Sequence, residues 1–157
     1  MKTILYSNLI RRNVNLPVVR SRAKLVEIVA SQERKYWCVM DILIETGLIE
    51  HEGKYYDPSY LKKVHEKGPL SLKKDGEKNS RSNPTGDIFL SRLKDSKVLG
   101  PNREEIGRIY DYELYISQTP WIVWKILVRP AGLSPTKRRL RISTKEIEKV
   151  DIKKVYL

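Results

Sequence analysis

Cationic side chains are the residues whose types and spacing could do chemistry in this sequence, and that chemistry is the binding of phosphate. Residues 1–24 contain no Asp or Glu, and neither do the residues between Glu113 and Glu146. The whole chain carries 31 Lys and Arg against 19 Asp and Glu, a formal net charge of +12. A field of one sign favours a polyanionic partner, because each phosphate contact releases condensed counterions. Solubility alone is the alternative reason for such a charge. The candidate nucleic-acid-binding residues are Arg11, Arg12, Arg20, Arg22, Lys24, Arg34, Lys35, Lys54, Lys73, Lys74, Arg81, Lys137, Arg138, Arg139 and Arg141.

The residue types that carry catalysis are scarce and poorly spaced. His51 and His65 are the only histidines, and no Cys or carboxylate stands at metal-ligand spacing from them. Glu104 and Glu105 are neighbours in an expected turn, so they are not expected to converge on one substrate atom. The sequence has neither a glycine-rich phosphate loop nor a nucleophile elbow. We therefore expect a protein that is not an enzyme and has no catalytic residues, no metal site and no cofactor.

Cys38 is the only cysteine, which rules out a disulfide within the chain. It lies in an apolar pattern and is predicted to be a core residue. A single unpaired cysteine favours an intracellular setting, here the cytoplasm, and no apolar run is long enough for membrane insertion. Few Gln residues together with many Lys, Arg and Ile are typical of thermophilic, archaeal-like proteins.

The elements that must position the cations begin with a basic arm and a helical domain in residues 1–65. Apolar stripes predict helices over residues 17–31 and 33–46. A tight hairpin is expected at Glu52-Gly53, followed by a short third helix that opens at Asp57.

Residues 44–49, followed by a wing over residues 50–56, resemble the winged helix-turn-helix family. That resemblance implies a DNA-binding regulator, with Lys54 on its wing. Asp41 and Glu45 depart from the family, because base readout favours Arg, Asn or Gln on the recognition helix.

Residues 66–87 are predicted to be a polar, basic linker. The segment is rich in Lys, Ser, Gly and Pro and poor in apolar residues. Such a composition does not bury enough surface to fold alone.

Residues 88–157 are predicted to form a small β-domain without any visible internal repeat. Apolar and β-branched residues predict strands over residues 106–114, 121–128, 139–143 and 150–157. A short turn at residues 144–147 is expected to separate the last two.

The glycine and hydrophobic spacing of this region resembles the PRC-barrel family. The pattern is carried by Gly100, then by Gly107, Ile109 and Asp111 in a G-x-(I/V)-x-D strand, and by the terminal residues 155–157. The resemblance implies a compact six-stranded barrel of the adaptor kind, without catalytic residues. Members of that family have been linked to RNA handling, photosynthetic electron-transfer assembly and archaeal cell division. The basic loop before the fourth strand departs from the family and favours a phosphate contact.

The expected fold class is therefore α+β: a winged helix-like domain, a linker and a PRC-type barrel. The expected function is that of a non-enzymatic RNA-binding adaptor, associated with the ribosome or its maturation. RNA is favoured over DNA, and other proteins of a large assembly are expected partners. The alternatives are a winged-helix DNA-binding regulator and a protein–protein scaffold such as a cell-division adaptor.

Overall fold

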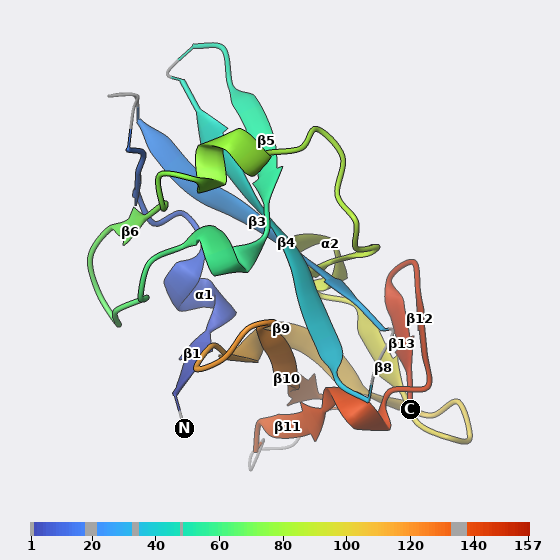
Figure 1. Cartoon of the computed structure of the whole chain (residues 1–157). Coiled ribbons are helices and arrows are strands. Elements are labelled where there is room, and N and C mark those ends of the chain that lie inside the picture. The colour runs from blue at the N-terminus through green and yellow to red at the C-terminus, as the bar shows by residue number, and fades with distance from the viewer. Residues whose placement is uncertain (1, 18–21, 33–34, 48, 133–137) are drawn as a thin grey trace.

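The computed structural model describes residues 2–17, 22–32, 35–47, 49–132 and 138–157, and most of its regular structure is β-strand (Figure 1). The strands are β1 (Thr3–Leu5), β2 (Val14–Asn15), β3 (Ala23–Ser31), β4 (Trp37–Thr46), β5 (Glu52–Tyr56), β6 (Leu70–Ser71), β7 (Ile88–Phe89), β8 (Lys97–Leu99), β9 (Glu105–Tyr115), β10 (Ile122–Pro130), β11 (Leu140–Ser143), β12 (Lys149–Asp151) and β13 (Lys154–Tyr156). The helical pieces are α1 (Tyr6–Leu9), α2 (Leu90–Leu93) and the 3-10 turns η1 (Pro58–Tyr60), η2 (Gly76–Asn79) and η3 (Thr144–Glu146). None of the helices in the described residues is long or apolar enough to cross a membrane.

The predicted α+β class with an N-terminal winged helix is wrong. The segments expected to be helices over residues 17–31 and 33–46 contain the two strands β3 and β4, which pair antiparallel. Both are rich in β-branched residues and are buried on both faces along much of their length. A continuous apolar run of this kind does not distinguish a buried helix from a buried strand, and the β-branched side chains favour the strand.

The expected hairpin turn and recognition helix are corrected as well. Glu52 and Gly53 lie inside β5, which pairs with β4, so the turn comes before them. The third helix is only the 3-10 turn η1, where Asp57 accepts a hydrogen bond from the Ser59 backbone N–H at 2.9 Å. No recognition helix exists in the described part of residues 1–65, so the DNA-reading alternative loses the element on which it depends.

The strands expected over residues 106–114, 121–128 and 139–143 are confirmed, whereas the single strand expected over residues 150–157 is the antiparallel pair β12 and β13. β9, β10 and β11 pair in sequence, and η3 provides the expected turn before β12 and β13. β13 closes beside β8 in a parallel pair.

The structure reveals an internal duplication that the sequence reading missed. A shift of 84 positions takes Leu25 to Ile109 and its partner Ile44 to Val128, and both strand pairs share a bulge at the same place. α1 and α2 are both four-residue helices, each followed by a residue with positive φ, Arg11 at 70° and Asp95 at 67°. The parallel pairs β2–β6 and β8–β13 also correspond. We call residues 2–72 the first half and residues 88–157 the second half.

The halves exchange their first strand and helix. β1 pairs with β9 of the second half, whereas β7 pairs with β3 of the first half. Figure 1 shows β1 and α1 beside β9, far from it in sequence. The strands of both halves surround one hydrophobic core, which includes Leu25, Trp37, Ile109 and Ile126.

Each helix is capped by a carboxylate from the other half. Asp111 accepts hydrogen bonds from the Ser7 backbone N–H at 3.1 Å and from the Ser7 hydroxyl at 2.5 Å. Glu27 accepts the same two bonds from Ser91, with 3.1 Å to the backbone N–H. Neither helix has a side-chain cap of its own. These carboxylates therefore satisfy backbone donors that a helix start leaves unpaired.

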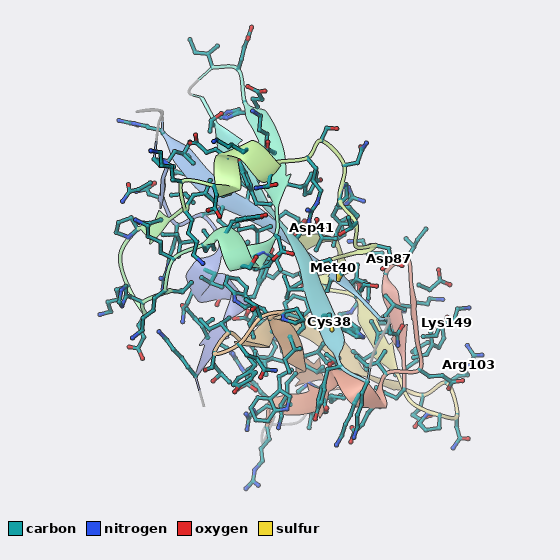
Figure 2. The ribbon with its side chains drawn as sticks, viewed as in Figure 1. Cys38, Met40, Asp41, Asp87, Arg103 and Lys149 are labelled. Carbon is teal, nitrogen blue, oxygen red and sulfur yellow. The ribbon has the colours of Figure 1, made fainter. Side chains whose placement is uncertain are left out.

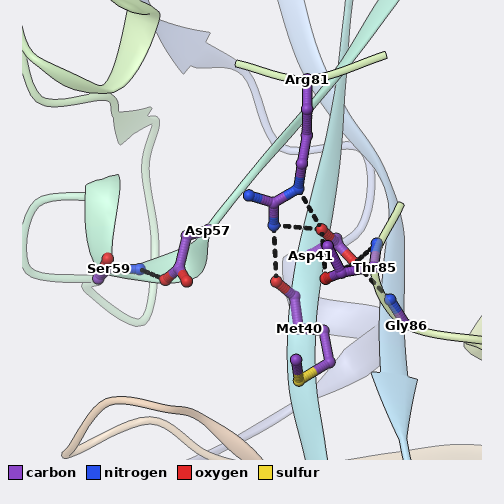
Figure 3. A network of polar contacts seen from close by, with 7 residues as sticks. All are labelled: Met40, Asp41, Asp57, Ser59, Arg81, Thr85 and Gly86. Atoms are coloured by element: carbon purple, nitrogen blue, oxygen red, sulfur yellow. Dashed lines mark hydrogen bonds and ion pairs between the residues drawn. The ribbon is translucent and has the colours of Figure 1, made fainter. Parts of the chain in front are cut away.

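The connection between the halves is held by the fully buried Asp41 of β4 (Figure 3). Arg81 donates to its carboxylate, with Nε at 2.8 Å, and also donates to the Met40 carbonyl at 3.1 Å. The backbone N–H groups of Thr85 and Gly86 donate to the same carboxylate at 2.8 and 2.9 Å.

The range predicted as a linker contains β6 and η2, and its Leu70 and Leu72 are buried. Strands of residues 1–65 and of residues 88–157 join one sheet. The division of the chain into residues 1–65, 66–87 and 88–157 as separate folding units stays a prediction.

Candidate nucleic-acid interface

Four cations from both halves line one groove, which we call groove A. Arg11, Arg22 and Lys24 come from the first half, and Lys94 follows α2 of the second half. The groove has a volume of about 660 Å³ and is also lined by His51, Tyr6 and a single carboxylate, Glu45. Its predominant charge is therefore positive.

The fold places these four cations beside one acid, Glu45, which lies opposite Lys24 in the β3–β4 pair. The Arg11 backbone N–H donates to the Leu25 carbonyl at 2.7 Å, which fixes the turn after α1 against β3. Lys24 lies on β3 and is exposed, as are Arg11 and Arg22. Within the described ranges, Arg11, Arg22, Lys24 and Lys94 form no ion pair. Such an arrangement can attract and hold an anion with several negative charges.

Tyr6, one of the residues that line groove A, keeps its proton well above neutral pH. Burial raises the pKa of Tyr6, and the nearby charges of Glu27 and Asp111 raise it further, against a smaller lowering by Arg11. Tyr6 is 3% exposed and packs edge-on against Tyr112, with ring centroids 5.3 Å apart. Its hydroxyl therefore keeps its proton beside the cations.

The duplication produces a second groove in the corresponding place, which we call groove B. Its volume is about 310 Å³, and Tyr110, Arg108, Arg129 and Pro130 line it together with the acids Asp95 and Glu105. Arg108 Nε lies 3.8 Å from a Glu105 carboxylate oxygen. Groove B is thus smaller and more mixed in charge than groove A.

Several of the predicted phosphate-binding residues have structural partners instead. Arg12 donates to the carbonyls of Asn8 at 2.6 Å and His65 at 2.5 Å, and also to that of Glu66. Arg81 pairs with buried Asp41, and Arg141 pairs with Glu113 at 2.8 Å. These three guanidiniums already have partners within the protein.

The other predicted residues are spread over the surface. Arg11, Arg22 and Lys24 meet at groove A, and Arg139 lies over the Tyr110 ring of groove B at 4.6 Å. Exposed positions outside both grooves hold Lys35, Lys54, Lys73, Lys74 and Arg138. Arg20, Arg34 and Lys137 lie outside the described residues.

Sequence reasoning missed Lys94, Arg129, Arg103 and Lys149 as candidate contacts. Figure 2 shows Arg103 and Lys149 at the outer edge of the molecule, and both lie over the Tyr156 ring, at 4.8 and 5.8 Å. The repeat, in which Ser91-Arg92-Leu93 corresponds to Ser7-Asn8-Leu9, aligns Lys94 with Ile10 and so does not reveal it as a contact.

Cys38 is buried, as predicted, on a strand rather than a helix. Figure 2 places it beside Met40 and Asp41 along β4. Among the residues that the structure covers, no group of three His, Cys, Asp or Glu is arranged to hold a metal ion.

Comparisons with known proteins add little. No family model matches the sequence, and no curated protein is similar to it. The structure is similar to that of a 16S ribosomal RNA processing protein, RimM, from Pseudomonas aeruginosa, with 11% identity over 99% of this chain and 96% of that one. The TM-score of 0.32 is too low for this likeness to carry an argument about function.

Proposed function

We propose that this protein is a non-enzymatic RNA-binding adaptor associated with the ribosome or its precursors, and that groove A holds the phosphate backbone. The observation that supports this most is the convergence of Arg11, Arg22, Lys24 and Lys94 on one groove without an ion pair among the described residues. A phosphodiester chain supplies negative charges that balance the excess of cations in this groove, and its binding releases counterions.

RNA in a ribosomal particle is the partner favoured by the sequence resemblance over residues 88–157. That resemblance implies an adaptor, and the strands β9 to β13 on which it depends are present in the structure. The adaptor function needs only a rigid platform and a charged surface, which the shared core and groove A supply.

Sedimentation of cell lysate tests the proposal. The wild-type protein should move with ribosomal particles at low salt and leave them at high salt, because counterion release weakens as salt rises. The double variant Arg22→Glu with Lys24→Glu should lose this co-sedimentation. Lys62→Glu with Lys63→Glu is the matched control, since it reverses two exposed charges outside both grooves.

Wild-type protein that sediments free at every salt concentration would refute the ribosomal association. Equal loss in both double variants would show that net charge matters and groove A does not.

A protein–protein scaffold is the second candidate, and one surface feature favours it. Ile152 is 87% exposed at a cleft that Ile88, Phe89, Leu93 and Val150 also line. If this cleft holds a protein partner, Ile152→Glu should abolish capture of that partner from nuclease-treated lysate. Unchanged capture would remove this candidate.

A further inference from the structure

The same bulge supplies one lining residue to each groove. In β3 the bulge lies between Leu25 and Glu27, and in β9 the irregularity falls at the matching place. The extra residues are Val26, which lines groove A, and Tyr110, which lines groove B. A bulge redirects a side chain out of the regular alternation of a strand and is frequent beside functional sites. The same bulge position therefore holds a different side chain in each groove, valine in groove A and tyrosine in groove B.

In groove B that residue is an aromatic ring with two guanidinium groups over it. The Arg139 guanidinium lies 4.6 Å from the Tyr110 ring centroid, and that of Arg129 lies 5.7 Å away. Both arginines are exposed, while Tyr110 is partly buried and held by its strand. Flat aromatic and guanidinium groups are the surfaces on which unpaired nucleic-acid bases stack.

Consecutive residues link the two grooves, since Lys94 lines groove A and Asp95 lines groove B. We infer that groove B takes an unpaired base, stacked on Tyr110 and its arginines, of the same RNA strand whose phosphates groove A holds. This inference rests on the proposed function and narrows its partner to RNA with single-stranded nucleotides. The acids Asp95 and Glu105 disfavour a second phosphate in groove B, whereas a neutral base faces no such repulsion.

Binding of two RNA probes to the full chain tests the inference. One probe is a short single-stranded oligouridylate, and the other is the same sugar-phosphate chain without bases. The wild-type protein should bind the oligouridylate about tenfold more tightly than the abasic probe, the size expected for one stacked base.

Tyr110→Val should remove most of this preference while leaving the affinity for the abasic probe unchanged. Valine is the residue at the corresponding position 26, so this variant reproduces a side chain that the same bulge already accommodates. Tyr115→Val, on the same strand but outside groove B, is the matched control and should keep the preference. Tyr110→Trp should keep the preference, because it keeps an aromatic ring at this position.

The possible failures are distinguishable. Wild-type protein that binds neither probe overturns the proposed function together with this inference. Equal affinity for both probes, or an unchanged preference in Tyr110→Val, overturns the inference and leaves the proposed function standing. A loss of oligouridylate and abasic binding alike in Tyr110→Val also contradicts it, since stacking acts on the base alone.

Discussion

The two halves of this protein share a backbone and differ in the residues that face the grooves. Arg11, Val26 and Glu45 in the first half correspond to Asp95, Tyr110 and Arg129 in the second. The residues that build the shared frame changed much less, since Ser7 and Ser91 are identical and Glu27 corresponds to Asp111. The comparison shows that the residues of the crossed helix caps are similar in both halves, while the residues that line the grooves differ in charge and size.

One feature breaks the correspondence entirely. Asp41 is fully buried on β4, whereas its counterpart on β10 is Lys125. Asp41 holds the connection between the two halves through Arg81, Thr85 and Gly86, a role that Lys125 does not have.

The largest loss of stability should come from removing the Asp41 carboxylate, which has no counterpart in the second half. Asp41→Ala leaves Arg81 and the backbone N–H groups of Thr85 and Gly86 without their acceptor, so the free energy of unfolding should fall by about 3 kcal/mol. Urea unfolding measures it, with the exposed carboxylate variant Asp151→Ala as the control. A loss below about 1 kcal/mol would show that the connection does not depend on Asp41.

The next largest loss of stability should come from the serines at the two crossed helix caps, and it should be equal in both halves. Ser7→Ala and Ser91→Ala each remove a hydroxyl that donates to the opposite half's carboxylate, and each should cost about 1 kcal/mol of unfolding free energy. Unequal costs measured by urea unfolding, with one variant as stable as wild type, would mean that only one crossed cap contributes to stability.

A substitution at position 45 tests the difference in charge between the two grooves. Glu45→Arg gives groove A the cation that groove B carries at Arg129. RNA affinity should rise several-fold, and the slope of log affinity against log salt should steepen by about one unit. Fluorescence anisotropy at a series of salt concentrations measures both. An unchanged slope would indicate that no phosphate lies near Glu45.

The smallest effect concerns alkaline pH. Burial raises the pKa of Tyr112 well above its ordinary value, and burial likewise raises that of Tyr6. These tyrosines stay protonated in the folded state while the unfolded chain releases their protons from about pH 10, so stability is full below that pH and falls above it. Tyr6→Phe and Tyr112→Phe should flatten this decline in urea unfolding between pH 9 and 11, a range set on either side of about pH 10. An equally steep decline in both variants would show that other titratable groups cause the loss of stability at alkaline pH.

The sequence predicted most strands of the second half, because residues 121–128 are dense in aromatic and β-branched residues and the Gly100-Pro101-Asn102 turn carries strong turn residues. It failed in the first half, where β3 and β4 are buried on both faces and lose the alternation that identifies a strand. The duplication was hidden because most positions that retain it are apolar and interchangeable, as Leu25 and Ile109 are.

The candidate interface was predictable only in part. The acid-free stretch in residues 1–24 indicated Arg11, Arg22 and Lys24, and these three lie together at groove A. Lys94 could not be added from local sequence, because it reaches the groove through the exchange of helices between the halves. Arg12 and Arg81 carry the same charge, but their partners are carbonyls and a buried carboxylate, which only the fold reveals.

Ultraviolet crosslinking of the wild-type protein to RNA in ribosomal particles, followed by mass spectrometry of the attached peptides, tests the central claim most directly. Binding of the phosphate backbone in groove A predicts crosslinks on peptides that contain Arg22 or Lys24 from the first half and on peptides that contain Lys94 from the second. Crosslinks confined to peptides far from groove A, such as those around Lys54 or Lys73, would contradict the account.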